Sequence, residues 1–241
     1  MRASFDASGE VLVVTGGANG IAAALARAYA AVGGTAVVLD IVPSAELDGV
    51  ERLLQKQVDV ADRDAVFAAV DDVVAEHGAV DSLLASAAVQ PRVDIAEMDP
   101  EVWTRTLAVN LNGVVWACQA VLPGMIERRR GSILMFASNL ANTGLAQASA
   151  YAASKGGIIA FGKSLAAEVA AHDVRVNVVF PGIIDTPQFR HANGETAREQ
   201  WASIGVGEPE DVVGPLMFLL SAEATMTGST LTRDRVYPER A

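Results

Sequence analysis

The fold is decided by residues 11–22, which read Val11-Leu12-Val13-Val14-Thr15-Gly16-Gly17-Ala18-Asn19-Gly20-Ile21-Ala22. The aliphatic run at its start is typical of a strand buried on both faces. Apolar residues then recur at helical spacing from Ile21 to Val32, so a helix follows the glycine turn. Such a turn is also found in ordinary strand-to-helix connections. Its position after the first strand favours a dinucleotide site, because glycines let the backbone approach a pyrophosphate that rests on the helix N-terminus.

The same alternation continues along the chain. Further strands are predicted at 35–39, 57–58, 82–87, 132–136 and 174–180, and helices at 62–78, 99–130, 150–171 and 209–220. Strands alternating with helices predict an α/β fold: a doubly wound, Rossmann-like parallel sheet of about seven strands with helices on both faces. The chain has 241 residues and no visible linker or repeat, so we expect residues 1–241 to form one domain.

Composition excludes several classes of partner. The net charge of −11 disfavours binding to nucleic acid or to anionic membranes. One cysteine and three scattered histidines predict no internal disulfide and no metal site. Residues 1–10 do not resemble a signal peptide, and no apolar run approaches the ~20 residues that cross a bilayer, so we expect a cytoplasmic protein.

Asp40 ends the second predicted strand and is followed by Ile41. A carboxylate at this position accepts the ribose hydroxyls of NAD and repels the 2′-phosphate of NADP. Neither arginine nor lysine occurs in the glycine turn, which favours NAD as the cofactor. The alternative is that Asp40 only caps a short helix. Asp59 follows the third predicted strand, and the sequence supports two interpretations equally. Asp59 either contacts the adenine of the cofactor or is an ordinary acidic residue of a loop.

Four polar residues are candidates for catalysis. Tyr151 and Lys155 are four apart and share one helix face. A nearby ammonium and the positive nicotinamide would lower the phenol pKa from its free value near 10. Ser138 follows a strand, where its hydroxyl could bind a substrate oxygen, and Asn110 is a polar residue inside the long helix. Taken alone, the Tyr–Lys pair is more typical of a solvated helix face.

The complete set of motifs closely resembles the short-chain dehydrogenase/reductase family from Val11 to Gly228. The motifs are the glycine turn, Asp59-Val60, Asn110, Ser138, Tyr151-Ala152-Ala153-Ser154-Lys155, Arg175-Val176-Asn177-Val178-Val179-Phe180-Pro181-Gly182 with Thr186, Gly207-Glu208-Pro209-Glu210-Asp211-Val212, and Thr227-Gly228. Thirteen positions separate Ser138 from Tyr151, as the family pattern requires.

The resemblance implies a role for each candidate. Tyr151 would exchange the proton of the substrate hydroxyl while hydride moves to or from the nicotinamide. Lys155 would hold the nicotinamide ribose and lower the tyrosine pKa, and Ser138 would orient the substrate oxygen. Asn110 would help to hold a water that links Lys155 to solvent. The implied cofactor contacts are Gly16, Asn19, Gly20, Ile21, Asp40, Ile41, Asp59, Val60, Ala87, Tyr151, Lys155, Pro181, Gly182, Ile184 and Thr186.

The sequence departs from the family pattern in three places. Ala22 replaces a glycine in the first motif, and Ala88 ends an Ala85-Ser86-Ala87-Ala88 turn that is usually Asn-Asn-Ala-Gly. Ala22 adds a methyl where helix and strand pack closely, which should cost some fit without abolishing cofactor binding. Ala88 lies in a turn whose backbone approaches the adenosine ribose in the family, so it should change the local geometry and the cofactor affinity. After Gly228 the usual Val-Asp-Gly-Gly-like turn is also missing. We therefore expect residues 233–241 to alter a subunit interface or to reach a neighbouring pocket.

The substrate segment is expected at 187–205, within the single domain. Phe189, Trp201 and Ile204 would form an apolar wall, with Leu140, Gln147 and the 90–93 loop opposite and Ser138 and Tyr151 at the base. This segment carries no basic cluster, which favours a neutral or mildly polar secondary alcohol or its ketone.

The helix from Tyr151 onward is rich in small residues. In the resembling family this helix and the 99–130 helix form subunit interfaces, so a homotetramer is predicted. Two alternatives to the alcohol dehydrogenase remain. One is a catalytically weak nucleotide sensor, and the other is an NADP-linked carrier-protein ketoreductase.

Overall fold

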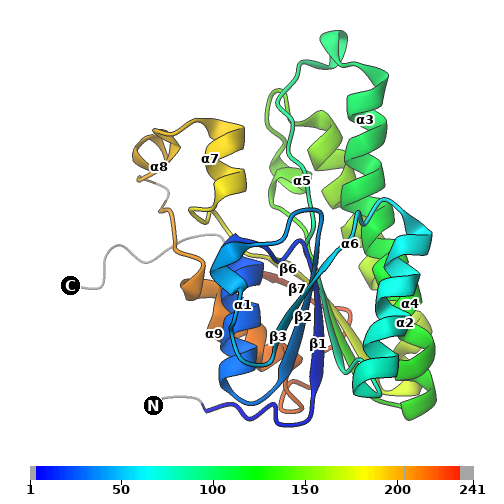
Figure 1. Cartoon of the computed structure of the whole chain (residues 1–241). Coiled ribbons are helices and arrows are strands. Elements are labelled where there is room, and N and C mark those ends of the chain that lie inside the picture. Colours follow the sequence, from blue (N-terminus) through cyan, green and yellow to red (C-terminus); the bar gives the residue numbers. More distant parts are fainter. Residues whose placement is uncertain (1–3, 204, 234–241) are drawn as a thin grey trace.

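The computed structural model describes residues 4–203 and 205–233. Its centre is a parallel sheet of seven strands in the order β3-β2-β1-β4-β5-β6-β7 (Figure 1). The strands are β1 (Val11–Thr15), β2 (Thr35–Asp40), β3 (Leu53–Gln57), β4 (Ser82–Ala85), β5 (Gly131–Phe136), β6 (Val174–Phe180) and β7 (Thr230–Thr232). The predicted Rossmann-like fold class is confirmed.

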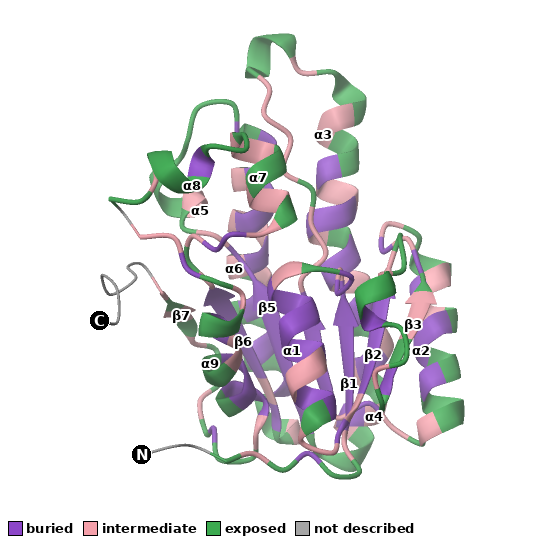
Figure 2. Cartoon of the chain, turned by 60° about the vertical axis from the view of Figure 1, so that its left-hand side comes forward, coloured by how far each residue is buried: buried purple, intermediate pink, exposed green. Residues whose placement is uncertain are grey.

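Helices cover both faces of this sheet. Helices α1 (Gly20–Ala31) and α9 (Glu210–Leu220) pack on one face, and α2 (Arg63–His77), α4 (Gly113–Arg128) and α6 (Ser149–Val169) pack on the other. Figure 2 shows the central strands buried between these two layers, with the exposed residues on the outer sides of the helices, in the loops and on the edge strand β7. The central strands are buried on both faces, which explains why their sequences are unbroken apolar runs.

Helix capping follows the predicted signals. The Asp62 side chain accepts hydrogen bonds from the backbone N–H groups of Asp64 and Ala65 at the start of α2. The Asp99 side chain likewise accepts a hydrogen bond from the Glu101 N–H at the start of α3 (Pro100–Leu107). Pro100 is the first residue of this helix, where a backbone N–H would have no partner within the helix, so proline loses nothing there.

Two predicted boundaries are wrong. The third strand is Leu53–Gln57 rather than 57–58, because it is an edge strand whose Gln55, Lys56 and Gln57 hide its extended pattern. The predicted 99–130 helix is interrupted by a π-helical turn at Ala108–Asn112, which separates α3 from α4. Turns of this kind concentrate at functional sites, and this one contains Asn110.

The continuous helical run Pro100–Arg128 is long and apolar enough to cross a membrane. The sequence-based expectation did not find such a run. In this fold, 44% of its most apolar window is buried. Its α4 portion packs against α2, β4 and β5, which is the environment of a core helix.

Strand order reverses between β1 and β4, which lie side by side although β2 and β3 separate them in sequence. A crevice opens at the carboxyl ends of parallel strands where the order reverses, and ligands bind there in folds of this type. The loops after β1, β4, β5 and β6 meet at this edge. Helices α5 (Leu140–Thr143), α7 (Pro187–Asn193) and α8 (Ala197–Gln200) lie above it (Figure 1).

Candidate active site

The glycine turn closely approaches the loop after β4. Gly16 has φ +68°, and a Cβ atom there would lie 2.4 Å from the Ala87 Cα. The Thr15 hydroxyl accepts hydrogen bonds from the N–H groups of Ser86 and Ala87, which fixes the two loops together. Only glycine fits this position, and the resulting cradle leaves room for a ligand against the backbone.

Helix α1 begins at this cradle without a side-chain cap. The Asn19 side chain makes no capping hydrogen bond, and the first turn of α1 carries no acidic residue. The N-terminal N–H groups and the positive end of the helix dipole therefore suit an anion such as a pyrophosphate. Asn19, Gly20 and Ile21 line the crevice beside them.

Asp40 lies at the far end of the crevice, with Ile41, Asp59 and Val60. One Asp40 carboxylate oxygen accepts a hydrogen bond from the Ala18 N–H at 2.9 Å, and the other accepts from Val42 at 3.2 Å. The carboxylate is thus fixed against the glycine turn, beside a cavity of about 810 Å³. This position suits a contact to the adenosine ribose.

Asp59 has partners of its own. Its carboxylate forms an ion pair with Arg105 at 2.9 Å and accepts a hydrogen bond from the Ala61 N–H at 3.0 Å. Partial burial acts to raise its pKa, but these contacts outweigh burial and hold the pKa below its usual value. Asp59 therefore stays ionised and lines the cavity wall as part of an ion pair.

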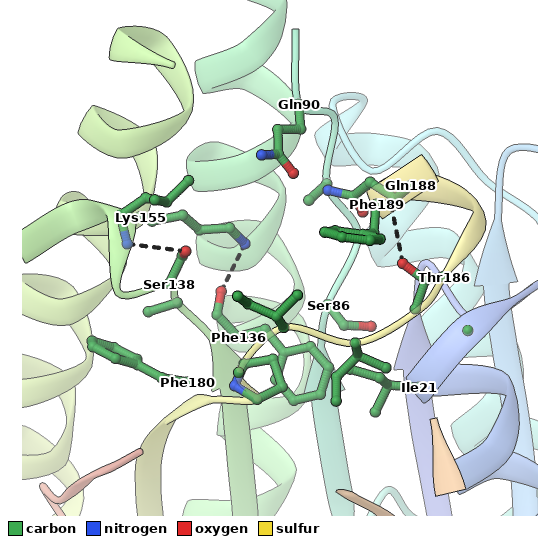
Figure 3. A pocket seen from close by; sticks show the side chains of 18 of the residues that line it. Ile21, Ser86, Gln90, Phe136, Ser138, Lys155, Phe180, Thr186, Gln188 and Phe189 are labelled. Atoms are coloured by element: carbon green, nitrogen blue, oxygen red, sulfur yellow. Dashed lines mark hydrogen bonds between the residues drawn. The ribbon is translucent and has the colours of Figure 1, made fainter. Parts of the chain in front are cut away.

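Tyr151 and Lys155 project from one face of α6 into a second cavity of about 410 Å³, which adjoins the first. The Lys155 Nζ lies 5.5 Å from the centre of the Tyr151 ring and donates to the Phe136 carbonyl at 2.7 Å (Figure 3). Ser138, on the loop after β5, lines the same cavity. The structure thus brings the three predicted catalytic groups together.

Burial dominates the ionisation of this pair. It raises the pKa of Tyr151 to about 12, opposed by the Ser138 hydroxyl and the positive charge of Arg92. It lowers the pKa of Lys155 to about 7. The expected lowering of the phenol pKa by Lys155 is not found in the protein without ligands, because the ammonium is itself desolvated. The phenol is therefore protonated at neutral pH.

Asn110 is fully buried on the π-helical turn. Its side-chain amide accepts a hydrogen bond from the Val89 N–H at 2.8 Å and donates to the Val89 carbonyl at 2.9 Å. It also donates to the Ser154 hydroxyl at 3.1 Å. Asn110 therefore ties the loop after β4 to the helix that carries Tyr151. The proposed water link to Lys155 stays a prediction.

The loop after β6 closes the crevice at the end that holds Tyr151 and Lys155. Pro181, Gly182, Ile184 and Thr186 all line the second cavity. A bridge between Ile184 and Gly207 holds this loop. The Thr186 hydroxyl caps α7 by accepting from the Phe189 N–H at 3.1 Å (Figure 3), and a Cβ atom at Gly20 would lie 3.0 Å from the Thr186 methyl.

Of the predicted substrate residues, the structure brings Leu140, Phe189 and Trp201 to the same cavity as Ser138 and Tyr151. The Phe189 and Trp201 rings pack edge to face, with centroids 6.2 Å apart. Gln147 is not placed with them, because its exposed side chain donates to Asp94 at 3.1 Å. Ile204 and residues 234–241 lie outside the described residues.

The departures from the family pattern fit the structure. Ala22 is a buried residue in the first turn of α1, and Ala88 lines both cavities without adopting a positive φ. Arg233 ends the described chain beside Gly182 and pairs with Asp211 at 3.3 Å. Its side chain also lines the catalytic cavity. Sequence reasoning did not single out this role, because it depends on the pairing of β7 with β6, after which the Arg233 N–H donates to the Phe180 carbonyl.

Residues 10–197 match the family model of short chain dehydrogenases. The chain belongs to the short-chain dehydrogenase/reductase family. The D-threitol dehydrogenase of Mycolicibacterium smegmatis is 35% identical, over 97% of this chain and 94% of the relative. The 3-oxoacyl-[acyl-carrier-protein] reductase of Thermotoga maritima is also 35% identical, over 94% and 96%.

A solved structure extends the likeness. The 3-ketoacyl-(acyl-carrier-protein) reductase from Brucella melitensis, complexed with NADH, has a TM-score of 0.87 and 26% identity, covering 95% of this chain and 98% of that one. This short-chain dehydrogenase is therefore an oxidoreductase that uses a nicotinamide cofactor. The Gly16 cradle and the uncapped start of α1 fit such a cofactor.

Proposed function

We propose that the protein is an NAD-dependent dehydrogenase that interconverts a small secondary alcohol and its ketone, with Tyr151 as the acid–base residue. The observation that carries this proposal is the shared position of Tyr151, Lys155 and Ser138 on one cavity wall, next to the cavity that Asp40 lines. Tyr151 is 8% exposed and Lys155 is 2% exposed. This burial argues against the alternative that the two residues belong to a solvated helix face.

The raised pKa of Tyr151 suits ketone reduction. A protonated phenol donates its proton to the substrate oxygen, while the Ser138 hydroxyl holds that oxygen in place. In alcohol oxidation the same phenol must lose its proton, and the nearby Arg92 charge helps by opposing the effect of burial on the pKa. When bound, the nicotinamide gives or accepts the hydride.

Lys155 then supports the site in two ways. Its Nζ is fixed by the Phe136 carbonyl at 2.7 Å, which places it to bind the hydroxyls of a ribose. Its pKa of about 7 allows it to gain or release a proton near neutral pH. A proton lost from Tyr151 can therefore be replaced through Lys155 without a change in the fold.

Asp40 supports NAD over NADP. Its carboxylate is fixed beside the adenosine end of the site by two backbone N–H groups, so it cannot turn away from a 2′-phosphate. Among the described residues lining that cavity, Arg105 is the one cationic side chain, and it is paired with Asp59. A phosphate there would meet the carboxylates of Asp40, Asp59 and Glu101 and a guanidinium that is already paired.

Two other functions are distinguishable by one experiment. A nucleotide sensor would bind NADH without turnover. The likeness to acyl-carrier-protein reductases also supports an NADP-linked ketoreductase, which would act on a carrier-bound or thioester substrate. A screen of alcohols, ketones and a 3-oxoacyl thioester at 340 nm, with each cofactor, separates the three. We expect turnover of a simple ketone, with NADH preferred.

A homotetramer in the cytoplasm is the assembly that we propose. In α6, Ala152, Ala153, Gly156 and Ala160 are all at least partly accessible, and a Cβ atom at Gly156 would meet nothing within 4 Å. Small side chains leave this helix face open to close approach by another subunit. Light scattering of the purified protein tests the assembly, and a monomeric mass would contradict it.

A further inference from the structure

The charge of the catalytic cavity is opposite to that of the protein. The chain has a net charge of −11, but the described residues that line this cavity include three basic side chains, Arg92, Lys155 and Arg233, and no carboxylate. Lys155 belongs to the catalytic set, and Arg233 is paired with Asp211. Arg92 lowers the pKa of the Tyr151 phenol through its charge, but the proposed reaction assigns no ligand contact to its guanidinium.

Arg92 connects the loop after β4 to helix α7 of the expected substrate segment, residues 187–205. Its Nε donates to the Ala192 carbonyl at 3.3 Å, and its Nη2 donates to the Asn193 side-chain oxygen, both at the end of α7. Both acceptors are neutral, and no ion pair of Arg92 is found among the described residues. The guanidinium is half-buried, and its desolvation lowers its pKa.

Arg92 faces the reacting end of the site. It lines the cavity with Tyr151, and its charge acts on the phenol, as the opposing effects on the two pKa values indicate. A half-buried guanidinium without a carboxylate partner is stabilised when an anion binds to it. The charge-assisted hydrogen bonds to the anion offset part of the hydration free energy that the guanidinium loses on burial. Arginine binds a carboxylate through two parallel N–H donors.

We infer that Arg92 binds a carboxylate of the substrate, so that the preferred substrates are hydroxy acids and the matching keto acids. This inference rests on the proposed function and narrows its substrate class. It differs from the neutral or mildly polar substrate that the sequence predicts. That prediction placed the 90–93 loop at the substrate cavity but gave Arg92 no role in binding. The aromatic pair Phe189 and Trp201 would cover the carbon skeleton between the carboxylate and the reacting oxygen.

The cofactor phosphates are the alternative source of the anion. They are expected at the start of α1, because the N-terminal N–H groups of this helix have no side-chain cap and are available to bind an anion. If Arg92 served them, its loss would weaken NADH binding. If it serves the substrate, NADH binding is retained and the ratio of kcat/KM for charged and neutral substrates changes, whatever the effect of the lost charge on Tyr151 and on overall turnover.

The test compares reduction of 4-oxocyclohexanecarboxylate and 4-oxopentanoate with reduction of their methyl esters, which keep the carbon skeleton but lack the charge. We expect kcat/KM of the wild-type protein to favour at least one acid over its ester. In Arg92→Gln this preference should fall by about 10- to 100-fold, the range for a charge-assisted hydrogen bond. Arg92→Lys should keep part of it.

Two controls separate charge from structure. Arg63→Gln removes a positive charge on α2, where Arg63 stacks over the Phe67 ring outside the described walls of either cavity, and should leave the acid-to-ester ratio unchanged. Calorimetry then compares cyclohexanecarboxylate with cyclohexanecarboxamide in the presence of NADH. The carboxylate should bind more tightly to the wild-type protein, and this difference should disappear in Arg92→Gln while NADH affinity stays within about twofold.

The outcomes distinguish the two proposals. Turnover of neutral ketones with an acid-to-ester ratio that Arg92→Gln does not change overturns the carboxylate inference and leaves the dehydrogenase proposal intact. Loss of NADH binding in Arg92→Gln also overturns it, in favour of the cofactor phosphates. NADH binding without turnover of any acid, ester or neutral ketone overturns the proposed function itself.

Discussion

The side-chain amide of Asn110 donates a hydrogen bond to the Ser154 hydroxyl at 3.1 Å, and so joins the π-helical turn to α6, the helix that carries Tyr151. The Ser154 hydroxyl in turn donates to the Tyr151 carbonyl at 2.7 Å. Through its two bonds to Val89, the same amide reaches the loop that carries Arg92. One buried side chain therefore positions both sides of the cavity.

Asn110→Ala should destabilise the protein and lower its activity. The change leaves the N–H and carbonyl of Val89 without their partner, at a cost of about 1–3 kcal/mol in the free energy of unfolding. Urea denaturation measures this loss. Asn112→Ala is the matched control, because Asn112 lies on the same turn with an exposed side chain and no hydrogen bond among the described residues. Equal effects in the two variants would contradict the positioning role.

Asp40→Asn should reduce the preference for NADH over NADPH by about tenfold or more, the effect of one charge–charge contact at partial exposure. Asparagine keeps an oxygen that can accept from the Ala18 N–H, so the contact to the glycine turn is preserved, and it loses the negative charge together with the longer contact to the Val42 N–H. The ratio of kcat/KM with the two cofactors measures the result. An unchanged ratio would show that the carboxylate acts only as a backbone cap.

Gly16→Ala should abolish NADH binding at micromolar concentrations. The new Cβ atom would lie 2.4 Å from the Ala87 Cα, and the residue would retain a φ that L-residues avoid, so the cradle must open. Gly214→Ala is the control, because a Cβ atom there meets nothing within 4 Å and lies in helix α9. It should stabilise the protein by about 0.5–1 kcal/mol and leave binding intact.

Stability of the ligand-free protein should rise between pH 7 and pH 9 through Lys155. Its pKa is about 10.5 when unfolded and about 7 when folded, so unfolding takes up a proton in this window and higher pH favours the folded state. The gain is at most about 1.4 kcal/mol per pH unit for one proton. Lys155→Met should lack this part of the slope. Parallel slopes for the two proteins in urea titrations at pH 7, 8 and 9 would refute the assignment.

Much of the fold could be predicted because apolar periodicity decides it. The strands at 11–14 and 174–180 are buried on both faces, and their sequences contain little else than apolar residues. The edge strand Leu53–Gln57 was misplaced because only Leu53 in it is buried. The π-helical turn was not predicted, since its residues follow an ordinary helical pattern and the interruption arises from tertiary packing.

The candidate site also contains residues that the sequence predicts and residues that only the structure places there. The glycine turn and the Tyr151–Lys155 pair have fixed spacings along the chain, so the sequence is enough to find them. Arg92 and Arg233 come from segments distant in sequence, and only the three-dimensional fold aims them at one cavity. The ionisation of Tyr151 also depended on burial, which raised its pKa where the sequence alone predicted a fall.

The central claim is that the Tyr151 phenol exchanges the proton with the substrate oxygen. It is tested most directly by measuring kcat at 340 nm for Tyr151→Phe beside its affinity for NADH, using a ketone that the wild-type protein reduces. We expect kcat to fall by about 10²- to 10⁴-fold, the usual contribution of a general acid, while NADH affinity changes little. Turnover within a fewfold of the wild-type value, with NADH bound normally, would contradict the account.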